Sequence, residues 1–365
     1  MNVGARGRAY LDGTSRLQGI DLARALAVLG MFAAHLIALP LPEIGDPATW
    51  IGLAGGRSSI LFATLAGVSL ALITGGTSPI AGRARTTARL RIVVRAALLW
   101  LIGILLIATT VPVYVILPAY ALLFVLALPV LGLGAKTLWI WAGVGAVTLP
   151  WLQPMWNALP IWQGTSGHDL SLLLGWHYPF TLWIVFLVAG LAIGRSSLRT
   201  VRTQVWLLLG GAAAVVLAQV ADAVVTPDPD TYLAPVWTMA EHTGGLLEVL
   251  GSGGGAVATI GACLLVCRTR IGAVLLPLRA VGAMPLTAYV GQLVVWVIGA
   301  ALLLGDVEDL AGFRALSPFW PFVIATVLFC TAWALLWGRG PLERLLDACS
   351  RRLVPSPGTA DRLGG

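Results

Sequence analysis

Long apolar runs, separated by short polar connections, make up most of the chain. Each run is close to the roughly 20 residues that an α-helix needs to cross the ~30 Å hydrocarbon core of a bilayer. The pattern therefore predicts an all-α, polytopic integral membrane helix bundle of about ten transmembrane helices, ten or eleven in number. Whether residues 96–133 form two helices or one broken helix is left open. The predicted spans cover residues 18–39, 58–76, 96–112, 114–133, 137–156, 178–194, 204–225, 249–267, 281–304 and 318–337.

The basic residues between these runs are distributed unevenly over the two sides of the membrane. With a cytoplasmic N-terminus, 21 of the 23 lysines and arginines fall on the inner side, and only Arg57 and Arg314 fall on the outer side. Cytoplasmic loops of membrane proteins typically carry such an excess of positive charge. We therefore expect a multi-pass protein of the plasma membrane, embedded in the lipid bilayer, with both termini in the cytoplasm.

Composition agrees with this class and excludes others. Only 11% of the residues are charged and 58% are hydrophobic, whereas a soluble domain has about 25% charged residues. The net charge of +7 follows the topology, so we expect no nucleic-acid partner. The four cysteines lack the spacing of a metal site, so no metal is expected either. The predicted organisation is one transmembrane domain over residues 16–353, between disordered cytoplasmic tails at 1–15 and 354–365.

The first span, within Arg16–Pro40, carries three polar residues on one helix face. At about 100° per residue, Arg24 and His35 lie about 60° and 40° from Asp21 on the same side. Asp21 and His35 are about 21 Å apart along the axis. Ionisable groups inside a membrane usually mark function, and for His35 we favour catalysis. Asp21 and Arg24 are expected to give structural support, although a simple ion pair at the membrane surface is an equal alternative.

Two further groups of residues lie at opposite ends of the spans. On the outer side, Glu241 and His242 are expected to act with His35, because an imidazole beside a carboxylate can accept a proton near neutral pH. A merely solvated loop histidine is an equal alternative for His242. Arg57 and His177 are expected to line a substrate vestibule there. On the inner side, three arginines precede the third span and suit phosphate binding, although they also serve as topology signals: Arg89, Arg91 and Arg95.

The segment RLQGIDLARALAVLGMFAAHL resembles the first span of the transmembrane acyltransferases. The acyltransferase-3 pattern of Asp, Arg three residues later and His fourteen residues after the Asp is present as Asp21, Arg24 and His35. Other segments, including GRSSILFATLAGVSLALITGG and PLRAVGAMPLTAYVGQLV, are similar to the bacterial branch of the heparan-α-glucosaminide N-acetyltransferase family. The resemblance covers about residues 16–300. Ala25 and Gln292 depart from it, since relatives usually have Gly and often His there.

The resemblance implies a membrane acyltransferase that uses acyl-CoA, with acetyl-CoA as the favoured donor and His35 as the catalytic residue. It would move the acyl group from the cytoplasm to an amine or hydroxyl of a glycan or cell-envelope acceptor on the outer side. A transporter or flippase for a small molecule or lipid is the alternative, although the matching broken helices typical of transporters are not evident. The acceptor, the acyl chain length and the oligomeric state are left open, with a homodimer as one alternative.

Overall fold

The computed structural model describes residues 9–13, 16–40, 45–228 and 230–355. Every regular element in these residues is a helix, so the predicted all-α class is confirmed. Helical spans satisfy their own backbone hydrogen bonds, which a bilayer core requires. The helices are α2 Gln18–Leu36, η1 Pro47–Ala54, α3 Arg57–Ile73, α4 Gly82–Ile107, α5 Leu117–Leu126, η2 Leu128–Gly132, α6 Ala135–Asn157, η3 Pro160–Trp162, α7 Gly164–Leu174, α8 Phe180–Arg195, α9 Val201–Val224, η4 Ala234–Trp237, α10 Leu246–Val266, α11 Ile271–Val274, α12 Leu276–Gly282, α13 Pro285–Leu303, α14 Leu310–Ala315, α15 Phe319–Leu336 and α16 Pro341–Leu353.

Each of the predicted spans overlaps one α-helix of at least ten residues, and the span 114–133 also contains η2. In order, these helices are α2, α3, α4, α5, α6, α8, α9, α10, α13 and α15. Within the described residues, 6 helices are long and apolar enough to cross a membrane, and up to 7 if η1 and α3, which are bent by 50°, count as one span. The apolar helices α5 and α8 are shorter. The class of polytopic membrane protein is therefore confirmed, and the total of about ten spans stays a prediction.

The region 96–133, left open above, forms two separate helices. Helix α4 ends at Ile107 and α5 begins at Leu117. Helix α4 also begins at Gly82, well before the apolar run at residue 96, so the basic segment 83–95 is its first half. Charged side chains lower the hydropathy of that segment, but arginine is a good helix former, which is why the helix extends beyond the apolar run.

The N-terminal tail differs from expectation at residues 9–13. Residues 9–12 are helical and Leu11 is fully buried. The buried guanidinium of Arg279 donates to the backbone oxygen of Leu11 at 2.7 Å and to the Asp12 carboxylate at 2.6 Å, and these bonds hold the segment on the bundle. Residues 1–8, 14–15 and 356–365, the remaining part of the two predicted tails, lie outside the described residues.

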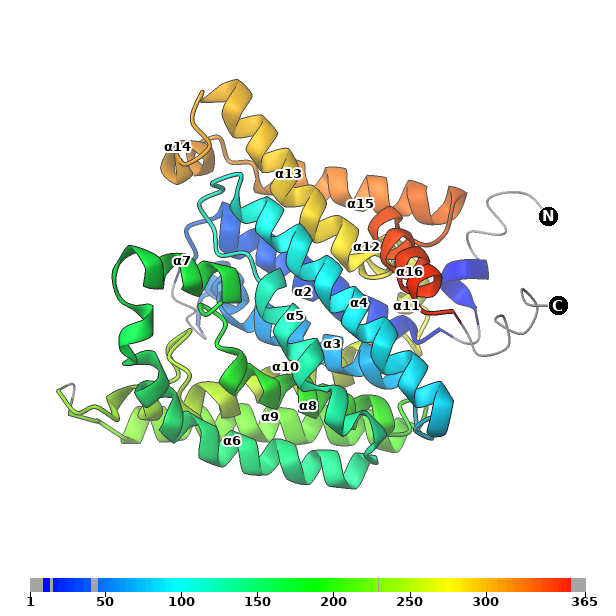
Figure 1. Cartoon of the computed structure of the whole chain (residues 1–365), viewed down its shortest axis with the longest axis horizontal. Coiled ribbons are helices and arrows are strands. Elements are labelled where there is room, and N and C mark those ends of the chain that lie inside the picture. Colours follow the sequence, from blue (N-terminus) through cyan, green and yellow to red (C-terminus); the bar gives the residue numbers. More distant parts are fainter. Residues whose placement is uncertain (1–8, 14–15, 41–44, 229, 356–365) are drawn as a thin grey trace.

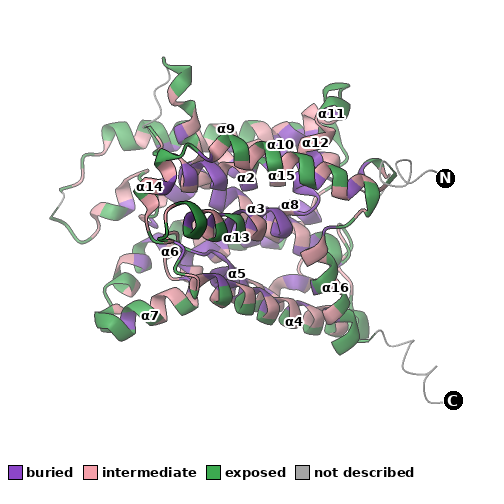
Figure 2. Cartoon of the chain, turned by 90° about the horizontal axis from the view of Figure 1, so that it is seen from above, coloured by how far each residue is buried: buried purple, intermediate pink, exposed green. Residues whose placement is uncertain are grey.

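Helix α2 lies at the centre of the bundle. It buries 67% of its most apolar 18 residues, whereas α15 buries 11% and faces outward. It packs against α3, α10, α12, α13 and α15, and Figure 2 shows buried residues gathered on the central helices while α4 and α9 carry exposed ones. Gly282 of α12 lies against the backbone of Asp21, where a Cβ atom would clash. Such small residues let membrane helices approach closely.

The helices arrange the polar residues at two opposite ends of the bundle. Helices α11 and α16 lie at one end, and α7 and α14 lie at the other (Figure 1). We call the first the basic end, because it holds the arginines of α16 and the first half of α4, and the second the histidine end, because it holds His35, His177 and His242. Helix α2 runs between them, with Arg24 and His35 about 16 Å apart along its axis.

Candidate functional site

A cavity of about 350 Å³ at the histidine end brings together four of the residues predicted from the sequence: His35, His177, Glu241 and His242. We call it the histidine cavity. These residues come from α2, from the connection between α7 and α8, and from the connection before α10. Ser58, Ser59, Tyr114, Tyr178 and Arg314 also line it. Chain segments more than 200 residues apart thus present bases, hydroxyls and one carboxylate to the same space.

Arg314 anchors the end of α2 that carries His35. From α14, its Nε atom donates to the backbone oxygen of His35 at 3.0 Å and a terminal nitrogen donates to that of Ala34 at 3.1 Å. The last carbonyl groups of a helix lack partners within the helix, and a cation there also complements the helix dipole. The sequence predicts that Arg314 lies on the outer side, but it does not reveal this contact with α2.

The imidazole of His35 lies between polar and aromatic groups of α13. Its Nδ1 atom is 3.3 Å from the side-chain amide of Gln292. The rings of Tyr289 and Trp296 lie with centroids 6.4 Å and 6.5 Å from that of His35. The ring is therefore held from one side, while the histidine cavity lies on another.

His177 and His242 form a stack of rings with Tyr114. The rings of Tyr114 and His177 are nearly parallel, at 9° and 3.8 Å between centroids, and the centroid of His242 lies 4.4 Å from that of His177. Burial, together with the adjacent His242, lowers the pKa of His177 to about 4. Burial also lowers the pKa of His242. Both imidazoles are thus neutral at physiological pH and able to accept hydrogen bonds.

The loop that carries Glu241 and His242 is shaped by Glu248. The buried carboxylate of Glu248 accepts hydrogen bonds from the backbone N–H of His242 at 2.8 Å and of Gly244 at 2.7 Å. His242 has a positive φ of 59°, a conformation that costs energy for a residue with a side chain. Glu248 therefore stabilises a strained backbone, a role that its position in the sequence did not reveal.

Glu241 points toward the backbone of Gly55, at the junction of η1 and α3. Burial raises the pKa of the Glu241 carboxyl, and the positive charge of Arg57 opposes that rise. Arg57, which begins α3, is not among the residues that line the histidine cavity. It therefore reaches the predicted vestibule only through its effect on Glu241.

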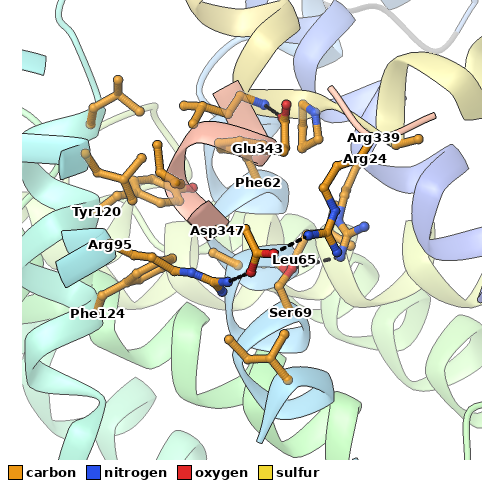
Figure 3. Close-up of a pocket in the computed structure, with 18 of the residues that line it drawn as sticks. Arg24, Phe62, Leu65, Ser69, Arg95, Tyr120, Phe124, Arg339, Glu343 and Asp347 are labelled. Carbon is orange, nitrogen blue, oxygen red and sulfur yellow. Dashed lines mark hydrogen bonds and ion pairs between the residues drawn. The ribbon is translucent and has the colours of Figure 1, made fainter. Parts of the chain in front are cut away.

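A second cavity, of about 370 Å³, lies toward the basic end. Four guanidinium groups line it, from Arg16, Arg24, Arg95 and Arg339, together with the carboxylates of Glu343 and Asp347. We call it the basic cavity. Figure 3 shows the Asp347 carboxylate between guanidinium groups, and it accepts hydrogen bonds at 2.8 Å from both Arg95 and Arg339. Arginines outnumber acids in this lining, so the cavity suits an anionic group.

Of the three arginines predicted to bind phosphate, only Arg95 lines this cavity. Arg89 donates to the backbone oxygens of Leu128 at 3.0 Å and Pro129 at 3.5 Å. Arg91 donates to the backbone oxygen of Val354 at 3.0 Å. These two arginines tie α4 to its neighbours. Arg16, Arg339, Glu343 and Asp347 were not identified from the sequence, because they come from segments outside the apolar runs.

Asp21 is the counter-charge of two arginines that line the basic cavity. Its carboxylate is 2% exposed and accepts from Arg24 at 3.1 Å, as expected from their i,i+3 spacing. Arg16 forms a second ion pair with Asp21 through two nitrogens, which the sequence did not predict. Arg24 also donates to Ser69 of α3 at 2.8 Å. Asp21 thus holds two of the four arginines of the cavity in place.

A residue that lines the basic cavity contacts a residue that lines the histidine cavity. The Tyr120 hydroxyl, on the basic side, donates to the backbone oxygen of Ser59, on the histidine side, at 3.4 Å. We call this contact the tyrosine partition.

In the described residues no group of three or more His, Cys, Asp or Glu side chains could hold a metal ion.

Comparison with family models gives two matches along the chain. The model described as heparan-alpha-glucosaminide N-acetyltransferase, catalytic, matches residues 16–223, which is more than half of the chain. A model described as a protein of unknown function (DUF418) matches residues 192–351. No curated protein and no solved structure matches the chain. The first match begins at Arg16 and contains His35, His177 and Arg95, so the chain belongs to the heparan-alpha-glucosaminide N-acetyltransferase catalytic family.

Proposed function

We propose that this protein is a membrane acyltransferase of the plasma membrane. It transfers an acyl group, acetyl in the favoured case, from cytoplasmic acyl-CoA to an amine or hydroxyl of a glycan or cell-envelope acceptor on the outer side. The observation that carries the proposal is the pair of cavities at the two ends of α2, one lined by arginines and the other by imidazoles. The match to the N-acetyltransferase family supports the reaction type.

The donor occupies the basic cavity, with its phosphates on Arg24, Arg95 and Arg339. Guanidinium groups bind phosphate bidentately, which favours such a cluster over a single cation. Arg89 and Arg91 act indirectly, by fixing α4. The thin pantetheine arm passes the tyrosine partition, where the Tyr120 side chain of the basic cavity contacts Ser59 of the histidine cavity. The thioester then reaches the neighbourhood of His35.

The acceptor binds in the histidine cavity, and His35 is the general base. As the acceptor oxygen or nitrogen attacks the thioester carbon, its proton moves to the free ring nitrogen of His35, and the carbon–sulfur bond breaks. The thiolate of CoA takes that proton, so the products are the acylated acceptor and free CoA. A positioned base contributes about 10²–10⁴-fold in rate. Glu241 and His242 orient the acceptor and assist its deprotonation.

The test uses purified protein in sealed vesicles, with acyl-CoA supplied on one side only. His35→Ala should reduce transfer by about 10²-fold or more, while His168→Ala, on the exposed face of α7, should keep the wild-type rate. Transfer that persists in the His35 variant contradicts the assignment of the base. Movement of an unmodified molecule across the vesicle membrane without acylation would instead favour the transporter alternative.

A further inference from the structure

Gln292 is the polar group that contacts the ring of His35. It lies on α13, is only 2% exposed, and both atoms of its side-chain amide are 3.3 Å from the Nδ1 atom of His35. Tyr289 and Trp296 lie on the same face of α13, three residues before and four residues after it, and their rings flank the imidazole. The amide oxygen can accept a hydrogen bond from Nδ1–H, and the amide NH₂ can donate one to a bare Nδ1. The side of the amide that faces the ring is therefore linked to the tautomer of His35.

We propose that Gln292 is a positioning residue that holds His35 in one tautomer. In that tautomer the Nδ1–H donates to the amide oxygen of Gln292, and Nε2 keeps its lone pair for the acceptor. A neutral imidazole has one donor and one acceptor nitrogen, and the hydrogen bond at one nitrogen sets the state of the other. The inference rests on the proposed function, because it assumes that His35 is the base.

The absence of charge on Gln292 also has a consequence for the reaction. A carboxylate at this position would favour the imidazolium form, and His35 would then be protonated before the acceptor arrived. An amide orients the ring without that charge, so the ring accepts the acceptor's proton and releases it to the departing thiolate. The titratable groups that share the cavity with His35 are Tyr114, His177, Tyr178, Glu241 and His242. Tyr289 on α13 lies beside the ring, and Arg314 adds a fixed positive charge.

The tautomer can be observed directly, without any substrate. Protein with ¹⁵N-labelled histidine side chains, in detergent at neutral pH, should give a His35 signal with a protonated Nδ1 and a bare Nε2; the signal is assigned by its loss in His35→Ala. In Gln292→Met, which keeps the side-chain volume, the population should shift toward the other tautomer. A proton on Nε2 in the wild type, or an unchanged tautomer in Gln292→Met, would overturn the proposal.

Kinetics give a second, independent test. Gln292→Met should lower kcat by about 10-fold or more while the KM for acyl-CoA stays the same, since the loss is part of what a general base contributes. Gln292→Glu should move the acid limb of the pH–rate profile to higher pH. The matched control is Gln204→Met, which removes another buried side-chain amide. Gln204 is 3% exposed and donates to the Leu198 backbone oxygen. This variant should have the same pH–rate profile as the wild type.

The two tests separate the inference from the proposed function. Equal kinetic losses in Gln292→Met and Gln204→Met, with an unmoved pH profile in Gln292→Glu, would make Gln292 a purely structural residue. If the wild-type protein transfers no acyl group at all, the proposed function fails, and the ¹⁵N signal still reports whether Gln292 sets the tautomer of His35.

Discussion

The rings of His177 and His242 lie 4.4 Å apart, too close for both to carry a positive charge without a large cost. We expect this pair to make the protein sensitive to acid. The folded state holds the pKa of His177 at about 4, below its ordinary value of 6.5. The stabilisation is therefore present above pH 6.5 and is lost as pH falls from 6.5 toward 4, because the unfolded chain binds the proton more readily.

The measurement is the thermal unfolding midpoint in detergent as a function of pH. The wild type should lose stability across this window, and His177→Gln should lose less. His168→Gln, on the exposed face of α7, serves as the control and should follow the wild type. If His177→Gln and the wild type have the same pH dependence, the two rings are not the source of the acid sensitivity.

A second prediction at this scale concerns Asp21. Asp21→Ala removes the carboxylate that pairs with Arg16 and Arg24, and it leaves two partly buried guanidinium groups without a counter-charge. Breaking a buried ion pair on one side costs about 3–5 kcal/mol, so yield and thermal stability should fall together with activity. Asp169→Ala, at an exposed position of α7, should leave yield, thermal stability and activity unchanged. A stable but inactive Asp21→Ala protein would show that Asp21 acts directly in the reaction.

Individual residues differed in how well their roles could be predicted from the sequence. His35, His177, Glu241 and His242 were identified because ionisable residues are rare near membrane spans, and the structure brings them into one cavity. The sequence did not identify Arg16, Arg339 and Asp347 as site residues, because they lie in polar segments where charged residues are common. Gln292 and Arg314 act through contacts across 257 and 279 residues of sequence, which no local pattern reveals.

At the scale of the elements, α16 is a helix that hydropathy alone does not find. It is amphipathic, and it places Glu343 and Asp347 in the wall of the basic cavity. Glu343 accepts from the backbone N–H of Leu286 at 2.8 Å and of Thr287 at 3.1 Å. It thereby caps the first turn of α13, whose N–H groups have no partners within the helix. One short helix thus connects the basic cavity to the helix that contacts His35.

Asp347 of α16 is expected to compete with the proposed donor for the arginines of the basic cavity. Burial alone would raise the pKa of its carboxyl, but Arg339, Arg351 and Arg95 outweigh burial and lower it. The carboxylate therefore occupies the arginines that would bind phosphate. We expect Asp347→Asn to bind CoA more tightly, on the order of 10-fold, with a steeper dependence on salt.

Calorimetric titration of the purified protein with CoA measures this effect. Asp306→Asn, an exposed residue at the opposite end of the bundle, is the control of equal charge change. Weaker CoA binding in Asp347→Asn would mean that the carboxylate organises the arginines instead of competing for them.

At the scale of the whole molecule, the apolar pattern was sufficient to predict an all-α membrane bundle and the positions of its long apolar helices. The total of about ten spans stays a prediction, because the apolar helices α5 and α8 are shorter than the helices that are long enough to cross a membrane. The separation of the polar residues into a basic end and a histidine end follows from the loops, and it is the basis of the predicted orientation.

That orientation can be tested by labelling. Single cysteines introduced in residues 157–177 and 227–246 should react with a membrane-impermeant thiol reagent in intact cells, because both loops are expected on the outer side. Cysteines introduced near Arg199 or Arg344 should react only after permeabilisation. If cysteines in residues 157–177 and in residues 227–246 are both protected in intact cells, the predicted topology is wrong. Replacing the native Cys263, Cys267, Cys330 and Cys349 removes background labelling.

The tyrosine partition also determines where an electric field acts in this molecule. In the predicted topology the two cavities open to opposite compartments, and we expect the membrane voltage to fall mainly between them, near Tyr120 and Ser59. Moving a unit charge through the full voltage changes its energy by about 2.3 kcal/mol per 100 mV. His35 lines the histidine cavity, so we expect protons that it exchanges with that side to cross little of the voltage. Protonation of His35 should then depend little on the membrane potential, whereas a charged group that passes from one cavity to the other should experience nearly all of it.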